Sequence, residues 1–226
     1  MPALDRLVQP LRAGELLSQE EFVRRWEALP SLKRAELIQG RVYLPSPVSN
    51  PHKWLHSLVD GWLLVYTSTT PGCRAGSDGT WLMLRDAPQP DLDLVILPDY
   101  GGQSRITGLY SVGAPELAAE VCLSSKARDL GPKLELYREA GVQEYLTVMH
   151  ADSSVTWRYL AGGQYTEIAP DTAGVLRSRV FPGLWLDVPA LFANDPARLL
   201  STLQQGLCTV EHERFVGELA AHKSGT

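Results

Sequence analysis

The chain has 226 residues, of which 44% are hydrophobic and 21% are charged. These values exclude a disordered polymer and allow one domain with a sizeable core and a helical appendage. The formal net charge of -5 excludes bulk electrostatic attraction to nucleic acid, so such a partner needs a local basic patch.

The cysteines and the chain start bear on the cellular compartment. Cys73, Cys122 and Cys208 lie far apart and form no CxxC pair, which argues against a zinc site and against a disulfide framework. The N-terminus has no signal-peptide pattern, and no apolar run approaches the roughly 20 residues that a membrane span needs. We therefore expect a soluble, reduced protein of the cytoplasm, with no membrane partner.

The first third of the chain predicts an arm, a helix, a hairpin and a second helix. Residues 1–17 are expected to form a loosely held arm, after which Ser18 and Glu21 make a capping box. Residues 35–44 are typical of two strands joined by a tight turn at residues 39–40. Asn50 is expected to cap a helix whose apolar side chains recur at helical spacing as far as Tyr66.

The middle of the chain predicts strands separated by loops. Residues 67–80 and 98–115 are rich in turn-forming residues and are expected to be loops, the second of them near the site. Short strands are expected at residues 81–84 and 91–97, and a buried strand at residues 117–123.

The last third predicts a helix at residues 129–140 and a hairpin of residues 144–149 and 154–159. Two terminal helices are expected after it, one capped by Asp195 and the other at about Val210 to Ala221. Because strands and helices are interleaved, the predicted fold class is α/β (α+β) with a mixed sheet. The predicted organisation is an N-terminal arm at residues 1–17, one domain at residues 18–190 and a C-terminal helical extension at residues 191–226.

Two expected strands carry carboxylates among apolar neighbours. Asp91 and Asp93 should project from one face of the first strand because side chains alternate along a strand. Glu120 lies in the middle of the second, where a carboxylate is costly unless it is paired. If the strands are neighbours, Asp91 and Glu120 can hold one hard cation, Mg²⁺ or Mn²⁺. The alternatives are a turn cap for Asp91 and a structural ion pair for Glu120.

An ordered series of motifs resembles the Uma-type family of restriction endonucleases, within the PD-(D/E)XK nuclease superfamily. The resemblance runs from about Phe22 to Asp187. Its motifs are Glu36-Leu-Ile-Gln-Gly-Arg-Val-Tyr, Pro51-His52, Pro90-Asp91, Ala119-Glu120-Val121, and Asp129-x-x-x-Lys133-x-x-x-Tyr137-x-x-x-Gly141-Val-x-Glu144-Tyr145. It implies a restriction-endonuclease-like core, in which a central mixed sheet is flanked by helices.

The resemblance also implies roles for residues. Asp91 and Glu120 match the two acidic metal ligands, but Cys122 stands where the superfamily has a lysine, and a thiol cannot supply a fixed positive charge. Lys133 is the candidate for a lysine moved to the following helix, with Lys126 as the runner-up. The catalytic set expected from the sequence is therefore Asp91, Glu120 and Lys133.

Several further residues are candidates for auxiliary roles. Glu36 and His52 match family positions that line the cleft, although bracing of the hairpin and plain packing are equally open for them. Tyr137 should lie over Lys133, one helical turn away, and Asp93 is expected to support the ligands. His56 follows His52 at metal-ligand spacing, which we interpret as coincidence.

These features predict a Mg²⁺-dependent endonuclease that hydrolyses phosphodiester bonds of nucleic acid, with DNA as the expected substrate and a homodimer as the expected assembly. Two other functions stay open. One is an inactive nuclease-fold module that binds nucleic acid or protein, which the missing lysine at position 122 favours. The other is a structural homodimer.

Overall fold

The computed structural model describes residues 9–44, 49–122 and 126–225, apart from the side chains of residues 126, 127 and 224. Its centre is a six-stranded sheet in the order β11-β10-β9-β8-β5-β3, in which β8 and β9 are parallel and the other neighbours are antiparallel. The strands of this sheet are β3 Cys73–Ser77, β5 Leu92–Ile96, β8 Leu117–Cys122, β9 Glu144–Met149, β10 Ser154–Ala161 and β11 Gln164–Glu167.

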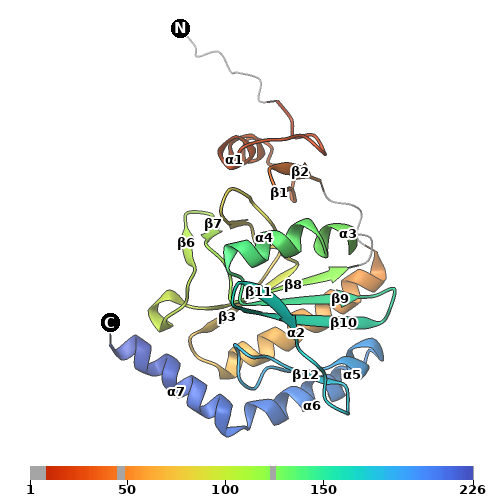
Figure 1. Ribbon diagram of the computed structural model, residues 1–226, viewed down its shortest axis with the longest axis vertical. Helices are drawn as coiled ribbons and strands as arrows, with labels where there is room; N and C mark the ends of the chain where they lie inside the picture. The colour runs from red at the N-terminus through yellow and green to blue at the C-terminus, as the bar shows by residue number, and fades with distance from the viewer. Residues whose placement is uncertain (1–8, 45–48, 123–125, 226) are drawn as a thin grey trace.

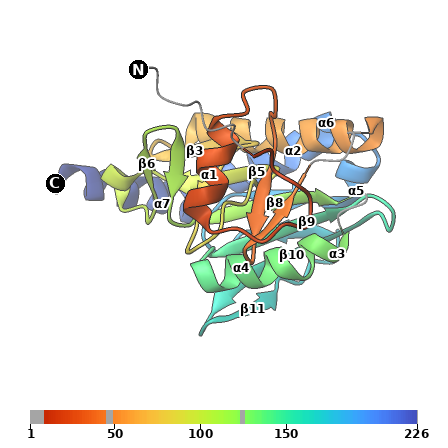
Figure 2. The ribbon, with the colours of Figure 1, turned by 90° about the horizontal axis from the view of Figure 1, so that it is seen from above.

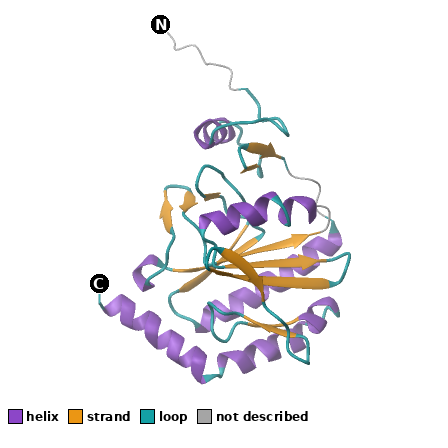
Figure 3. Cartoon of the chain, in the orientation of Figure 1, coloured by secondary structure: helices purple, strands orange, loops and turns teal. Residues whose placement is uncertain are grey.

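Helices cover both faces of the sheet (Figures 1 and 3). One face carries the short α3 and the longer α4, and the other carries α2 and the C-terminal helices. The larger apolar core lies on the α2 side and the smaller one on the α4 side. The helices are α1 Gln19–Glu27, α2 Asn50–Thr69, the 3-10 helix η1 Pro98–Tyr100, α3 Lys126–Asp129, α4 Pro132–Ala140, α5 Val188–Phe192, α6 Pro196–Leu207 and α7 Val210–Ser224.

A small N-terminal unit lies above the α4 side of the sheet, as Figures 1 and 2 show from two directions. It consists of α1 and the hairpin of β1 Glu36–Ile38 and β2 Arg41–Tyr43, and it has its own apolar cluster. The remaining strands form two small sheets: β4 Trp81–Leu82 with β6 Arg105–Thr107 and β7 Tyr110–Val112, and β12 Val175–Arg177 with β13 Trp185–Asp187.

The predicted fold class, a mixed sheet flanked by helices, is confirmed. The predicted helix caps and the predicted hairpin turn, which depend on neighbouring residues, are also present. The Ser18 hydroxyl accepts from the Glu21 backbone N–H at the start of α1, and the Asp195 side chain caps α6. The hairpin turn falls at residues 39–40, and both turn N–H groups donate to the carboxylate of Asp86.

Other boundaries differ from the expectation. Helix α2 has Ser49 rather than Asn50 as its N-cap and continues to Thr69, because the hydroxyls of residues 67–69 bond back to helix carbonyls. The expected loop of residues 67–80 also contains edge strand β3, which pairs with β5. Residues 98–115 form η1 and the β6–β7 hairpin. Strand β3 depends on its pairing with β5 and β7 also pairs with β4, which a local pattern does not contain, whereas β6 and β7 pair with each other across a tight turn.

The N-terminal arm is partly fixed. Residues 1–8 lie outside the described residues, but Leu11 is buried and residues 14–17 hydrogen-bond to β2 and its turn. The expected loose arm up to residue 17 is therefore replaced by a segment held against the hairpin. Within the described part of the chain, no helix combines the length and apolar character that crossing a membrane requires.

Candidate active site

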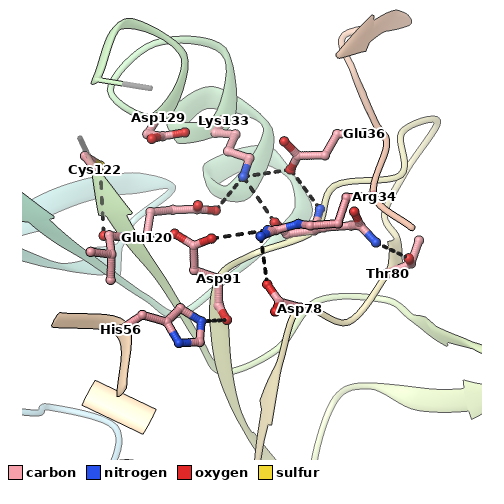
Figure 4. A network of polar contacts seen from close by, with 12 residues as sticks. Arg34, Glu36, His56, Asp78, Thr80, Asp91, Glu120, Cys122, Asp129 and Lys133 are labelled. Carbon is pink, nitrogen blue, oxygen red and sulfur yellow. Dashed lines mark hydrogen bonds and ion pairs between the residues drawn. The ribbon is translucent and has the colours of Figure 1, made fainter. Parts of the chain in front are cut away.

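The register of β5 and β8 brings the acidic residues to one face of the sheet. Asp93 pairs with Ala118, so Asp93, Ala118 and Glu120 project toward the α4 side. Asp91 immediately precedes β5, and its Oδ2 accepts a hydrogen bond from the Val121 backbone N–H at 2.9 Å. The carboxylate of Asp91 therefore lies beside the strand position of Glu120 (Figure 4). Both side chains are buried.

Lys133 enters this cluster from α4. Its Nζ lies 2.7 Å from Glu120 Oε1 and 2.7 Å from Glu36 Oε1, and it donates to the Gln89 carbonyl at 3.3 Å. The side chain is only 1% exposed. Pro132 at the start of α4 orients the first turn, so the ammonium lies between a carboxylate of β8 and one of β1 (Figure 4).

The charges of this cluster are mutually dependent. Burial would lower the pKa of Lys133, but the carboxylates of Glu120 and Glu36 outweigh burial and raise it above its ordinary value. Burial would raise the pKa of Asp91, yet the charge of Lys133 and the Val121 N–H lower it. At neutral pH the cluster therefore holds a protonated lysine and an ionised aspartate.

Glu120 is also buried, with 2% of its surface exposed. Burial raises its pKa well above the ordinary range, and the charge of Lys133 opposes that rise. Tyr137, one turn after Lys133 on α4, donates its hydroxyl to Glu120 Oε1 at 3.0 Å. Burial likewise raises the pKa of Tyr137, so the phenol stays a donor. An additional cation near Glu120 would favour its ionised form.

Two arginines, Arg34 and Arg128, complete the cluster, and the sequence analysis did not select Arg34. Arg34 bridges Asp91 Oδ1 at 3.2 Å and Asp78 Oδ1 at 3.0 Å (Figure 4). Arg128 lies 3.5 Å from Glu36 Oε2 and 3.3 Å from Asp129 Oδ1. Both guanidinium groups are partly exposed, unlike Lys133. The sequence signal for Arg34 was the need of buried carboxylates for cations, which does not identify the partner.

The remaining predicted residues lie around this centre. The His56 ring nitrogen is 3.0 Å from the Asp91 carbonyl, and the His52 and His56 rings contact each other with centroids 5.9 Å apart. Cys122 is buried, and burial raises the pKa of its thiol, so it stays neutral. The backbone of Lys126 begins α3, but its side chain lies outside the described residues.

Asp93 shares a sheet face with Glu120 but takes no part in the cluster. Its Oδ2 accepts from the Trp81 indole N–H at 3.1 Å, and it lines a separate cavity. Burial raises its pKa to about 6. The structure thus brings together Asp91, Glu120, Glu36, Lys133 and Tyr137, and leaves Asp93 apart because successive same-face residues of a strand lie about 7 Å from each other.

The donor chemistry fits a hydrated hard cation. Carboxylate oxygens are the ligands that Mg²⁺ prefers, and Mg²⁺ usually keeps several waters, so one or two carboxylates suffice. Two buried oxygens at the border of the cluster, Gln89 Oε1 and Asp129 Oδ2, have no partner within the described residues. Across that part of the chain no three His, Cys, Asp or Glu side chains form a ready metal cage. The fitting donors are therefore Asp91 and Glu120, completed by water.

Comparisons with known proteins agree with the fold. A family model described as "Uma2: Putative restriction endonuclease" matches residues 19–189. The chain is also similar to a solved structure titled as a "putative nuclease belonging to DUF820" from Anabaena variabilis, with a TM-score of 0.61 and 16% sequence identity. That match covers 78% of this chain and 98% of the other. Among curated proteins, none matches.

Proposed function

We propose that this protein, which belongs to the Uma2 family of restriction-endonuclease-like proteins, is a divalent-metal-dependent endonuclease that hydrolyses phosphodiester bonds of DNA. The observation that carries the proposal is the contact of Lys133 with Glu120 at 2.7 Å, beside a carboxylate of Asp91 held by the Val121 N–H. A carboxylate pair can hold the cation of metal-assisted phosphate hydrolysis, and an adjacent ammonium can stabilise the negative charge that develops.

In this proposal Asp91 and Glu120 hold Mg²⁺ or Mn²⁺, which supplies a polarised phosphate and a bound water of lowered pKa. Lys133 stays protonated, so it donates hydrogen bonds and does not accept a proton from water. Its positive charge stabilises the negative charge that develops on the phosphate. Tyr137 positions Glu120 through its hydroxyl, and Glu36 positions Lys133.

The partly exposed cations supply the contacts to nucleic acid. Arg34 and Arg128 have side chains that are 30% and 27% exposed, at the border of a cluster whose other members are buried. A guanidinium group matches phosphate oxygens in a bidentate way. Arg34 and Arg128 are therefore the proposed local basic patch through which this acidic chain contacts nucleic acid. We propose that a homodimer in the cytoplasm presents one such centre to each strand of a duplex.

A second function is favoured by one observation. Lys133 already pairs with Glu120 and Glu36, and Arg34 already pairs with Asp91, so internal cations compensate the acidic cluster. Such a cluster is stable as a structural network, and the chain could then act as a nuclease-fold module that binds nucleic acid or protein without cutting it.

Cleavage and its metal requirement separate the two functions. Purified protein is expected to nick and linearise supercoiled plasmid DNA in the presence of Mg²⁺ or Mn²⁺, because the ion must neutralise the phosphate beside two carboxylates. Removal of the metal with EDTA should stop cleavage, and renewed Mg²⁺ should restore it. A structured RNA in parallel reactions tests the choice of DNA. Intact DNA and RNA at every metal concentration would contradict the endonuclease and support the binding module.

A further inference from the structure

A cavity of about 310 Å³ lies beside the acidic cluster and takes no part in it. It is open on one side and is bordered by edge strand β3, by β5 and by the small sheet of β4, β6 and β7. Its lining combines one buried carboxylate, an aromatic ring, apolar side chains and two arginines. The residues that matter for its chemistry are Arg74, Gly76, Trp81, Asp93, Arg105 and Ile106.

Asp93 gives the cavity a buried acceptor. The residue is 7% exposed, and within the described part of the chain only the Trp81 indole N–H, on Oδ2, donates to it. A Cβ atom on Gly76 would lie 2.9 Å from Asp93 Oδ1, so glycine at position 76 makes the room that the carboxylate itself occupies. Asp93 Oδ1 is not among the sealed oxygens without a partner, and as part of the cavity lining the carboxylate can accept a donor from a ligand.

The opposite charge lies at the outer part of the cavity. Arg74 and Arg105 are exposed, and neither forms an ion pair with the described residues. Between the arginines and Asp93 the walls are apolar, with Val95, Leu97 and Ile106 among them. The cavity thus offers a buried carboxylate acceptor, apolar walls and two exposed positive charges.

We propose that this cavity binds a nucleotide, with an amino-bearing base on Asp93 and the phosphate on Arg74 and Arg105. This inference rests on the proposed function and deepens it. A simple anion would be repelled by Asp93, and a simple amine would be repelled by the arginines. A nucleotide joins N–H donors to a negative charge through a flat ring, and the Trp81 ring in the lining suits such a ring.

The position of the cavity suits a base next to the bond that is cut. Asp93 follows Asp91 by two residues and points to the same sheet face, which places the two side chains about 7 Å apart along the strand. The base would therefore lie one same-face position from Asp91, whereas Arg74, which pairs with Val95, and the phosphate that it binds lie on the other side of Asp93. The cavity would then hold a nucleotide next to the one whose phosphate is cut.

The free carboxylate oxygen sets the base preference. Guanine, cytosine and adenine carry exocyclic amino groups that donate to a carboxylate, as in the aspartate contact to the cytosine amino group. Thymine and uracil carry carbonyl oxygens at the matching positions, and these repel it. The cavity is therefore expected to prefer amino-bearing bases over uracil and thymine.

The test is calorimetric titration of the full chain, with EDTA present, using GMP, CMP, AMP and UMP as probes. Wild type should bind at least one amino-bearing nucleotide more tightly than UMP. In Asp93→Asn the amide oxygen can keep the Trp81 N–H and turn its NH₂ toward the cavity, so the preference should shift toward UMP by about tenfold. Arg105→Gln should weaken all four nucleotides, whereas Asp152→Asn, at the β9–β10 turn, should change none.

Two results would overturn the nucleotide site: equal affinity of wild type for the four nucleotides, or a base preference that is unchanged in Asp93→Asn. A shifted base preference in Asp93→Asn could not arise from unfolding, because an unfolded chain binds none of the nucleotides. Because no metal and no cleavage enter the titration, the two proposals fail separately. DNA cleavage without nucleotide binding overturns only the base site, and base-selective binding without cleavage overturns only the endonuclease.

Discussion

Lys133→Met is expected to lower the free energy of unfolding by about 3–5 kcal/mol, because removal of one partner leaves buried charge uncompensated. The ammonium is 1% exposed and contacts both Glu120 and Glu36 at 2.7 Å. Methionine fills much of the same volume but supplies no charge, so two carboxylates would remain close together without their cation. Urea unfolding, followed by tryptophan fluorescence at neutral pH, measures the change.

A double variant tests the reason for that loss. Adding Glu120→Gln to Lys133→Met removes one of the two carboxylates that have lost the Lys133 ammonium. The double variant should therefore be more stable than Lys133→Met alone. Exposed Lys33→Met is the control and should change stability little. A cost below about 1 kcal/mol for Lys133→Met would mean that the ammonium does not compensate the cluster.

Asp91→Asn and Glu120→Gln are each expected to reduce the rate of DNA cleavage on the order of 10³-fold, since several kcal/mol of metal-derived stabilisation would be lost. Both substitutions keep the shape of the side chain. The Val121 N–H can still donate to the amide oxygen at position 91, and Tyr137 and Lys133 can donate to the one at position 120. The measurement is the single-turnover rate at saturating Mg²⁺.

Glu116→Gln provides a matched control for Glu120→Gln. Glu116 is also a buried glutamate, directly before β8, but its carboxylate accepts from the Ile96 and Gln103 backbone N–H groups, away from Asp91. Its substitution should lower stability and leave the cleavage rate per folded molecule nearly unchanged. Cleavage by Glu120→Gln at the wild-type rate would remove this glutamate from the reaction.

The parts of the fold that could be predicted are those that short-range chemistry decides. The Ser18 cap, the turn at residues 39–40 and the Asp195 cap each follow from one side chain or one tight turn. Strand β3 was not predicted because it gains strand structure from its pairing with β5, whereas the β6–β7 hairpin is local and was missed in a segment rich in glycine and proline. Gly76 in β3 weakens a strand signal and is explained only by the nearby Asp93 carboxylate.

In the candidate site, too, local spacing predicts some of the contacts, and others depend on segments that are distant in the sequence. Alternation along two strands places Asp93 and Glu120 on one face, and helical spacing places Tyr137 near Lys133. The bridge of Arg34 from Asp91 to Asp78 depends on how the N-terminal unit lies over the sheet, which no local pattern specifies. The metal-binding and catalytic roles of Asp91, Glu120 and Lys133 stay predictions.

Glu144 is a residue of the family-like motifs whose contacts in the structure are those of a structural support. It belongs to the series that resembles the family, yet its carboxylate accepts from the Trp157 indole, the Ser178 hydroxyl and the Arg179 backbone N–H. It thereby holds the segment before β13 against the sheet. Sequence alone does not separate such a brace from a ligand, because both are carboxylates in apolar strands.

Asp91 and Glu120 are proposed to share one divalent cation. Titration of the metal-free protein with Mn²⁺, followed by the electron paramagnetic resonance signal of the free ion, tests this sharing without any substrate. One Mn²⁺ site per chain is expected in wild type and in Asp99→Asn, and loss of that site is expected in both Asp91→Asn and Glu120→Gln. Unchanged Mn²⁺ binding in those two folded variants would show that the two carboxylates do not hold the cation.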